Sequence, residues 1–130
     1  MVLTYVDSSV ALAYLFAEPR QPRPHVWGGR LTSSRLLEYE IGTRVHARGG
    51  AARMYDSARA LLAGIDLLEL DRSTLARALY PFPIHLRTLD GLHLATMHFL
   101  SRQGESVELA SYDNRLLTAA AALGIPAAAI

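Results

Sequence analysis

The order of apolar and polar positions predicts strands that alternate with helices. Five short apolar runs bounded by turn-forming residues are typical of strands, at residues 2–6, 31–33, 65–70, 107–112 and, most weakly, 125–130. Apolar residues recur at helical spacing between them, over residues 9–16, 34–48, 51–63, 73–80, 88–103 and 113–123. Because strands that alternate with helices form parallel sheets with right-handed crossovers, we expect an α/β fold.

The first apolar run ends in a carboxylate, Asp7. The run is rich in β-branched and aromatic residues, which favours a strand that is buried on both faces. Ser8 and Ser9 follow it and favour a helix start. Open α/β sheets usually place their chemistry at the carboxyl ends of such strands. The question is therefore which other acids converge on Asp7.

Length and composition narrow the possible classes. A chain of 130 residues with 51% hydrophobic residues fits one domain, residues 1–130, with a single sizeable core. There is no cysteine, so neither a disulfide framework nor a thiolate metal site is possible. The longest apolar runs are shorter than the roughly 18 residues that span a bilayer. We expect a cytoplasmic protein that does not enter a membrane.

The basic residues are unevenly distributed. Formal net charge is only +1, so a global basic field is no argument for a nucleic-acid partner. All 13 basic residues are arginines, however, and seven of them lie between Pro19 and Arg53. Arginine binds phosphate in a bidentate manner, so this stretch has the chemistry to contact a polyanion. Ordinary solvated helix faces are an equally good explanation.

Glu40 is the first acid that falls on an apolar helix face. Leu36, Leu37, Ile41 and Val45 form the apolar stripe of the helix over residues 34–48, and Glu40 lies on or beside it. Burying a carboxylate costs several kcal/mol unless it is paired or binds a cation. An ordinary i,i+4 pair with Arg44 is the alternative. Glu38, displaced around the helix, is expected to pair with Arg35 in solvent.

Asp90 is the second such acid. It falls in the first turn of a helix that is apolar nearly all round, which predicts burial. Its ordinary role would be a favourable interaction with the helix N-terminus. Asp90 and Gly91 both have low helix propensity, so a function explains their place better. His93, one turn further on, is expected to be a buried core residue rather than a metal ligand.

Asp113 follows the fourth predicted strand and opens the last helix. Taken alone, Asp113 and Asp7 would both be helix N-caps. In a parallel sheet, however, the carboxyl ends of the strands share one edge, and the helix starts near Glu40 and Asp90 lie close to it. Four acids without a lysine repel one another. Oxygen ligands of this kind suit Mg²⁺ or Mn²⁺, and one or two such ions can support phosphoryl displacement.

Four segments together carry a family resemblance. They are Tyr-Val-Asp-Ser-Ser (5–9), Leu-Leu-Glu-Tyr-Glu-Ile-Gly-Thr-Arg (36–44), Leu-Asp-Gly-Leu-His-Leu-Ala-Thr (89–96) and Ser-Tyr-Asp-Asn-Arg-Leu-Leu-Thr-Ala-Ala (111–120), the last followed by Leu-Gly-Ile-Pro. In these segments and their order the chain resembles PIN-domain proteins, specifically the VapC toxins of bacterial toxin–antitoxin pairs. The resemblance covers the whole chain.

The resemblance implies a three-layer α/β/α fold with a five-stranded parallel sheet of order 3-2-1-4-5. It implies an Mg²⁺- or Mn²⁺-dependent endoribonuclease that is neutralised by a small antitoxin protein and is usually a homodimer. By position, its catalytic and metal-binding residues would be Asp7, Glu40, Asp90 and Asp113, with Ser9 supporting the first. Asn114 stands where many relatives have a further Asp, which makes catalysis by one ion an open alternative.

Other functions are also consistent with an acid after the first strand. Phosphatases of the haloacid-dehalogenase type and response-regulator receivers share that feature, but both use a lysine, which this chain lacks. A protein-binding module that keeps the fold without cleaving RNA is the main alternative. Arg44 and Arg115 are candidates for contacts with carboxylates or with RNA phosphate. Tyr14, Leu15, Phe16 and Trp27 are candidates for an antitoxin groove, although Trp27 fits the core slightly better.

Overall fold

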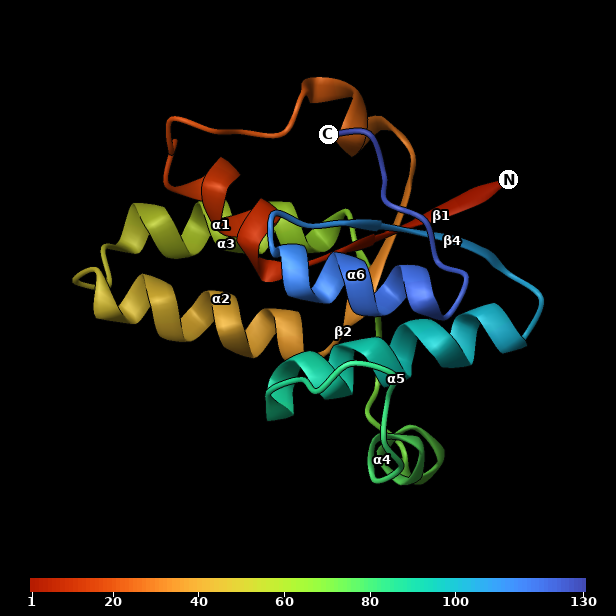
Figure 1. Ribbon diagram of the computed structural model, residues 1–130. Coiled ribbons are helices and arrows are strands. Elements are labelled where there is room, and N and C mark those ends of the chain that lie inside the picture. Colours follow the sequence, from red (N-terminus) through yellow and green to blue (C-terminus); the bar gives the residue numbers. More distant parts are fainter.

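Strand β1 lies in the interior of a parallel sheet, and the remaining strands are added on either side of it (Figure 1). The computed structural model describes all 130 residues. The strand order is β3-β2-β1-β4, and every pairing is parallel. The strands are β1 (Val2–Val6), β2 (Arg30–Ser34), β3 (Asp66–Leu68) and β4 (Ser106–Ala110). The predicted α/β class is therefore confirmed.

Helices cover both faces of the sheet. They are α1 (Ser8–Leu15), α2 (Leu36–Ala47), α3 (Ala52–Ala63), α4 (Arg72–Ala78), α5 (Thr88–Arg102) and α6 (Asn114–Ala122), with a 3-10 turn, η1 (Pro24–Gly28), in the proline-rich stretch. None of these helices is long and apolar enough to cross a membrane.

Two hydrophobic clusters separate the layers, because successive residues of β1 point to opposite faces. Leu3 and Tyr5 belong to a cluster with residues of α5 and α6, such as Leu94 and Leu116. Val6 belongs to the other cluster, which residues of α1, α2 and α3 complete. The alternation along one strand thus produces the three-layer α/β/α arrangement that the resemblance implied.

The predicted fifth strand is reduced to a single bridge. Ala127 pairs with Leu109 in parallel, so the C-terminal segment does lie beside β4, as the order 3-2-1-4-5 requires. Leu109 donates to Pro126 O at 2.8 Å, and Ala128 donates back to Leu109 O at 2.8 Å. Pro126 has no N–H to extend the ladder, which explains why no regular strand forms.

The helix predicted from Ser33 or Ser34 begins later, at Leu36. Both serines belong to β2, and both are fully buried. Ser33 Oγ donates to Val6 O at 2.8 Å, and Ser34 Oγ accepts from the Leu36 N–H at 3.1 Å. The Ser34 hydroxyl thus supports the helix start without belonging to the helix.

The core of α2 provides a test of this packing. Leu37 is fully buried against the second cluster, so Leu37→Ala should lower the free energy of unfolding by about 2–5 kcal/mol. Tyr39→Ala on the same helix is the matched control, because Tyr39 is 63% exposed and its truncation should change little. Urea denaturation followed by circular dichroism measures both. Equal losses in the two variants would contradict the assigned core.

Candidate active site

The carboxyl ends of β1 and β4 open onto a cavity of about 390 Å³. Three of the four predicted acids line it, namely Asp7, Asp90 and Asp113. They come from the end of β1, the first turn of α5 and the start of α6. The topology thus brings together residues that are up to 106 positions apart, 7 to 113, as the sheet-edge argument anticipated.

Asp7 is buried, with only 5% of its surface exposed. Its Oδ2 accepts hydrogen bonds from Ser9 Oγ at 2.7 Å, from Ser111 Oγ at 2.8 Å and from the Ser9 N–H at 3.4 Å. These donors offset the cost of burying a carboxylate. Because all three bonds fall on Oδ2, Oδ1 makes none. Ser9 was expected in this place, whereas Ser111 was missed, although it directly follows β4.

Asp90 is half-buried and carries no hydrogen bond on its carboxylate. Burial raises the pKa of the Asp90 carboxyl, and the negative charges of Asp113 and Asp7 raise it further. Nearby His93 opposes this rise, and Glu40 adds to it. The cavity is therefore a place where negative charges crowd.

Asp113 is the N-cap of α6, as expected of this residue taken alone. Its Oδ1 accepts from the backbone N–H groups of Arg115 at 3.0 Å and Leu116 at 3.3 Å. Its own N–H donates to Ser111 Oγ at 2.9 Å. Capping occupies only Oδ1, so a place in the cavity and a capping role coexist in one side chain.

Glu40 does not line the cavity. Its side chain is 16% exposed, and the imidazole of His93 contacts its Oε1. Ser8 Oγ donates to Oε2 at 3.2 Å, which attaches Glu40 to the residue next to Asp7. The alternative pair with Arg44 does not form. Glu38, by contrast, pairs with Arg35 at 2.8 Å in solvent, as expected.

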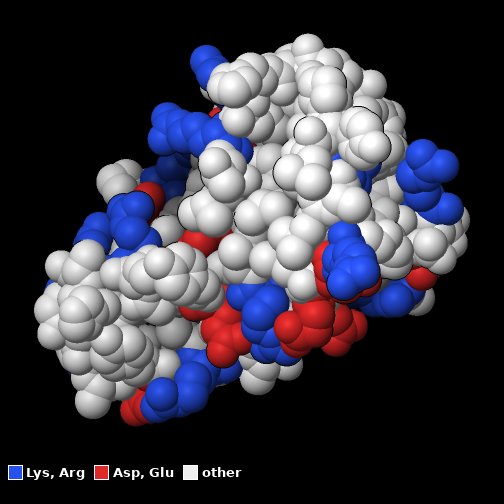
Figure 2. All heavy atoms as spheres, turned by 90° about the horizontal axis from the view of Figure 1, so that it is seen from below, with Lys and Arg blue, Asp and Glu red and all other residues white.

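Arginines accompany the acids in the cavity. Arg20 and Arg44 both line it, and the Arg20 guanidinium lies 3.9 Å from the centre of the Tyr112 ring. Arg115 does not line it. Arg20 was not singled out from the sequence, because it falls in an irregular stretch without periodicity. Figure 2 shows one face of the molecule on which carboxylates lie beside arginines, so a net charge of +1 conceals strong local charge of both signs.

The donor set has the chemistry of a hard divalent cation, because it consists of carboxylate oxygens without lysine or cysteine. Asp7 Oδ1 and the Asp90 carboxylate make no hydrogen bonds and so are free to ligate. In this structure, however, no three His, Asp or Glu side chains are close enough to hold a metal ion together.

Charge crowding at Asp90 predicts a pH-dependent stability. Since its folded pKa is raised, the native state holds a proton more tightly than the unfolded state, and stability falls as pH rises above about 3.9. Asp90→Asn cannot ionise at this position, so it should not lose stability in this way as pH rises. In EDTA, the variant should therefore melt at a higher temperature than the wild type at pH 7, with the difference vanishing near pH 3.

Asp56→Asn is the control for that measurement, since Asp56 is an exposed acid that pairs with Arg59. It should bring no gain at pH 7. An Asp90→Asn variant that melts below the wild type at pH 7 would contradict the crowding. Thermal denaturation followed by circular dichroism measures all three proteins.

Comparison with known proteins agrees with this architecture. The model of the PIN domain family matches residues 4–122. Ribonuclease VapC47 of Mycobacterium tuberculosis is 32% identical, over 94% of this chain and 93% of its own length. Ribonuclease VapC46 of the same species is 34% identical over 96% and 95%. Ribonuclease VapC35 is 36% identical over 74% and 70%.

The matched region runs from within β1 to the last residue of α6, so it includes all four acids, both arginines of the cavity and the whole of β2, β3 and β4. The VapC ribonucleases cover nearly all of the chain at about a third identity. The chain therefore belongs to the PIN domain family.

Proposed function

We propose that this protein is a nuclease that cleaves phosphodiester bonds of RNA with the help of Mg²⁺ or Mn²⁺. The observation that carries the proposal is the cavity at the sheet edge, where the three predicted carboxylates from distant parts of the chain, and a fourth from Glu18, meet two arginines. The relatives named ribonucleases support the choice of RNA as substrate.

The roles follow from the chemistry of each side chain. Asp7, Asp90 and Asp113 would hold the cation, with Glu40 beside them, and Ser9 keeps Asp7 in place through its 2.7 Å hydrogen bond. A bound Mg²⁺ or Mn²⁺ supplies Lewis acidity to water and to the phosphoryl group.

The arginines complete the proposed substrate site. Arg20 and Arg44 line the same cavity as the acids and have the bidentate geometry that suits a backbone phosphate. The guanidinium of Arg20 lies over the ring of Tyr112, and this cation–π contact restricts its position. The carboxylates of the cavity repel phosphate by themselves. A polyanion would therefore approach them only when cations are bound there.

A protein-binding module without nuclease activity is the alternative function. It is favoured by the finding that no three acidic or histidine side chains are close enough to hold a metal ion together. The two proposals make opposite predictions for purified protein, because only the nuclease should cleave RNA when Mn²⁺ is added.

We further propose that the protein acts as the toxin of a toxin–antitoxin pair and binds a small antitoxin protein. Tyr14 is 47% exposed and its ring lies 5.1 Å from that of Trp27. Leu15, Phe16 and Trp27 pack against the second cluster, so they contribute only partly to a surface. Tyr14 is therefore the main apolar side chain that this end of α1 offers to such a partner.

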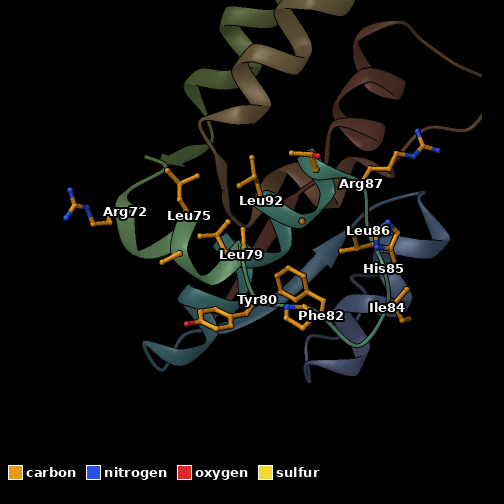
Figure 3. A pocket seen from close by; sticks show the side chains of 15 residues that line it. Arg72, Leu75, Leu79, Tyr80, Phe82, Ile84, His85, Leu86, Arg87 and Leu92 are labelled. Carbon is orange, nitrogen blue, oxygen red and sulfur yellow. The ribbon is translucent and has the colours of Figure 1, made fainter.

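A homodimer is the other proposed assembly. Leu75, Leu79 and Tyr80 are exposed apolar side chains that line a groove of about 1070 Å³ between α4 and the start of α5. Figure 3 shows that Arg72 and Arg87 extend away from its apolar middle at either end. An exposed apolar surface of this kind suits a subunit interface.

Removal of single cavity acids tests the nuclease. Asp7→Asn and Asp90→Asn should each lower metal-dependent RNA cleavage by more than the roughly 10- to 100-fold typical of outer-shell substitutions, because each removes a negatively charged ligand. The fold should survive in both, since size and shape are kept. Cleavage of an RNA pool with Mn²⁺, compared with EDTA, measures the loss.

Asp56→Asn serves as the control that keeps full activity, since Asp56 is exposed and lies outside the cavity. Circular dichroism verifies that each variant is folded. Full activity in both Asp7→Asn and Asp90→Asn would refute the proposed site. The absence of metal-dependent cleavage in the wild type would favour the binding module.

The dimer is tested by introducing a negative charge into the apolar groove. The wild type should have the mass of two 14.2 kDa chains in light scattering, and Leu79→Glu should shift it to one, because a buried unpaired carboxylate opposes association. Tyr39→Glu is the matched control, since Tyr39 is 63% exposed but outside the groove. A wild type of one chain's mass would exclude the dimer.

A further inference from the structure

A line of buried polar contacts runs beside the cavity and centres on His93. This residue is fully buried in α5. Its Nδ1 lies 2.7 Å from the hydroxyl of Tyr5, and its Nε2 contacts Oε1 of Glu40. The rings of Tyr5 and His93 meet edge to face, with centroids 5.8 Å apart. Both ring nitrogens of His93 are therefore occupied.

The line returns to its starting strand. Ser8 Oγ donates to the second oxygen of Glu40 at 3.2 Å, and Ser8 directly follows Asp7. Tyr5 stands two residues before Asp7 on the same strand. The contacts thus run from Tyr5, which precedes Asp7 in the sequence, through His93 of α5 and Glu40 of α2 to Ser8, which follows Asp7. They connect three elements that each supply an acid: β1, α5 and α2.

The donors and acceptors in this line can be assigned from their chemistry. An ionised carboxylate only accepts, so the contact with Glu40 requires a proton on Nε2 of His93. In the neutral ring with this proton, Nδ1 accepts from the hydroxyl of Tyr5, and in the doubly protonated ring Nδ1 donates to it, so Nε2 carries a proton in both cases.

A second histidine on the same helix provides a contrast. His98 accepts from Arg77 Nε at 3.0 Å and contacts no acid. His93 instead contacts the carboxylate of Glu40, whose other oxygen accepts a hydrogen bond from Ser8 Oγ. An apolar side chain in place of His93 would leave the buried hydroxyl of Tyr5 and Oε1 of Glu40 without this partner. Of these two groups, Glu40 is the one that Ser8 also ties to the residue next to Asp7, so the effect of His93 on the site is transmitted through Glu40.

We propose that His93 is a positioning residue, which holds the Glu40 carboxylate at a fixed place relative to Asp7 and Asp90. His93 touches neither the cavity nor a substrate in it, so it acts through Glu40. This inference rests on the proposed function, because the position of Glu40 matters for catalysis only if the cavity cleaves RNA. Outer contacts of this type commonly determine how well a ligand binds.

Substitutions of His93 test the role. His93→Leu should weaken Mn²⁺ binding to the metal-free protein, and should lower kcat for RNA cleavage, by about 10- to 100-fold each while KM changes little. His93→Gln should recover most of both, because its amide N–H lies near the position of Nε2. His98→Leu, on the same helix, is the control and should change neither. Calorimetry measures Mn²⁺ binding apart from activity.

Two outcomes would overturn the proposal. One is His93→Leu with unchanged Mn²⁺ binding and kcat. The other is a wild-type nitrogen NMR spectrum in which Nε2 of His93 carries no proton. Should His93→Leu fail to fold, His93→Gln is compared with His93→Asn, whose amide falls near Nδ1 instead, and equal values in the two would count against the role.

These readouts also separate the inference from the proposed function. A wild type that neither cleaves RNA nor binds Mn²⁺ refutes the nuclease, and with it any catalytic meaning of the position of Glu40. A wild type that does both, with His93→Leu equal to it, refutes only the role of His93.

Discussion

The burial of a carboxylate at the end of β1 is the constraint on which the site depends. Asp7 is almost fully withdrawn from solvent, and an unpaired charge there would cost several kcal/mol. Its donors come from α1, through Ser9, and from the segment after β4, through Ser111. The charge is therefore tolerated only when β1 and β4 are paired in register. The same contacts therefore hold β1 beside β4 and position the carboxylate of the site.

Negative charge at this edge opposes the stability that the two hydrophobic clusters provide. Asp90 has a raised pKa because burial and neighbouring acids both disfavour its ionised form. No lysine exists to neutralise it, and the two arginines of the cavity do not form ion pairs with it. Perturbed pKa values of this kind cluster at functional sites, which agrees with the proposed cation-binding role of these acids.

Sequence patterns predicted the parallel sheet, because hydrophobic periodicity depends on local residues, and they placed Asp7, Asp90 and Asp113 at one edge of it. The strand order came from the family resemblance. The patterns predicted Glu40 beside an apolar stripe but not its partner. His93 lies 53 positions away, and only the packing of α5 against β1 and α2 brings the two together. The predicted fifth strand does not form as a regular strand because Pro126 has no N–H to extend the hydrogen-bond ladder. Arg20 was predicted only as one of seven arginines of a basic stretch, because an irregular segment has no periodicity that would single it out.

Glu38 and Glu40 show how the fold assigns different chemistry to identical side chains. Two positions apart on α2, they point about 200° around the helix from each other. Glu38 pairs with Arg35 in solvent, where such a pair contributes little. Glu40 has both oxygens fixed by His93 and Ser8, whereas Asp7 and Asp113 each use only one oxygen. The four acids are therefore not equivalent: three keep ligating capacity toward the cavity, and the fourth is anchored beside them by the protein.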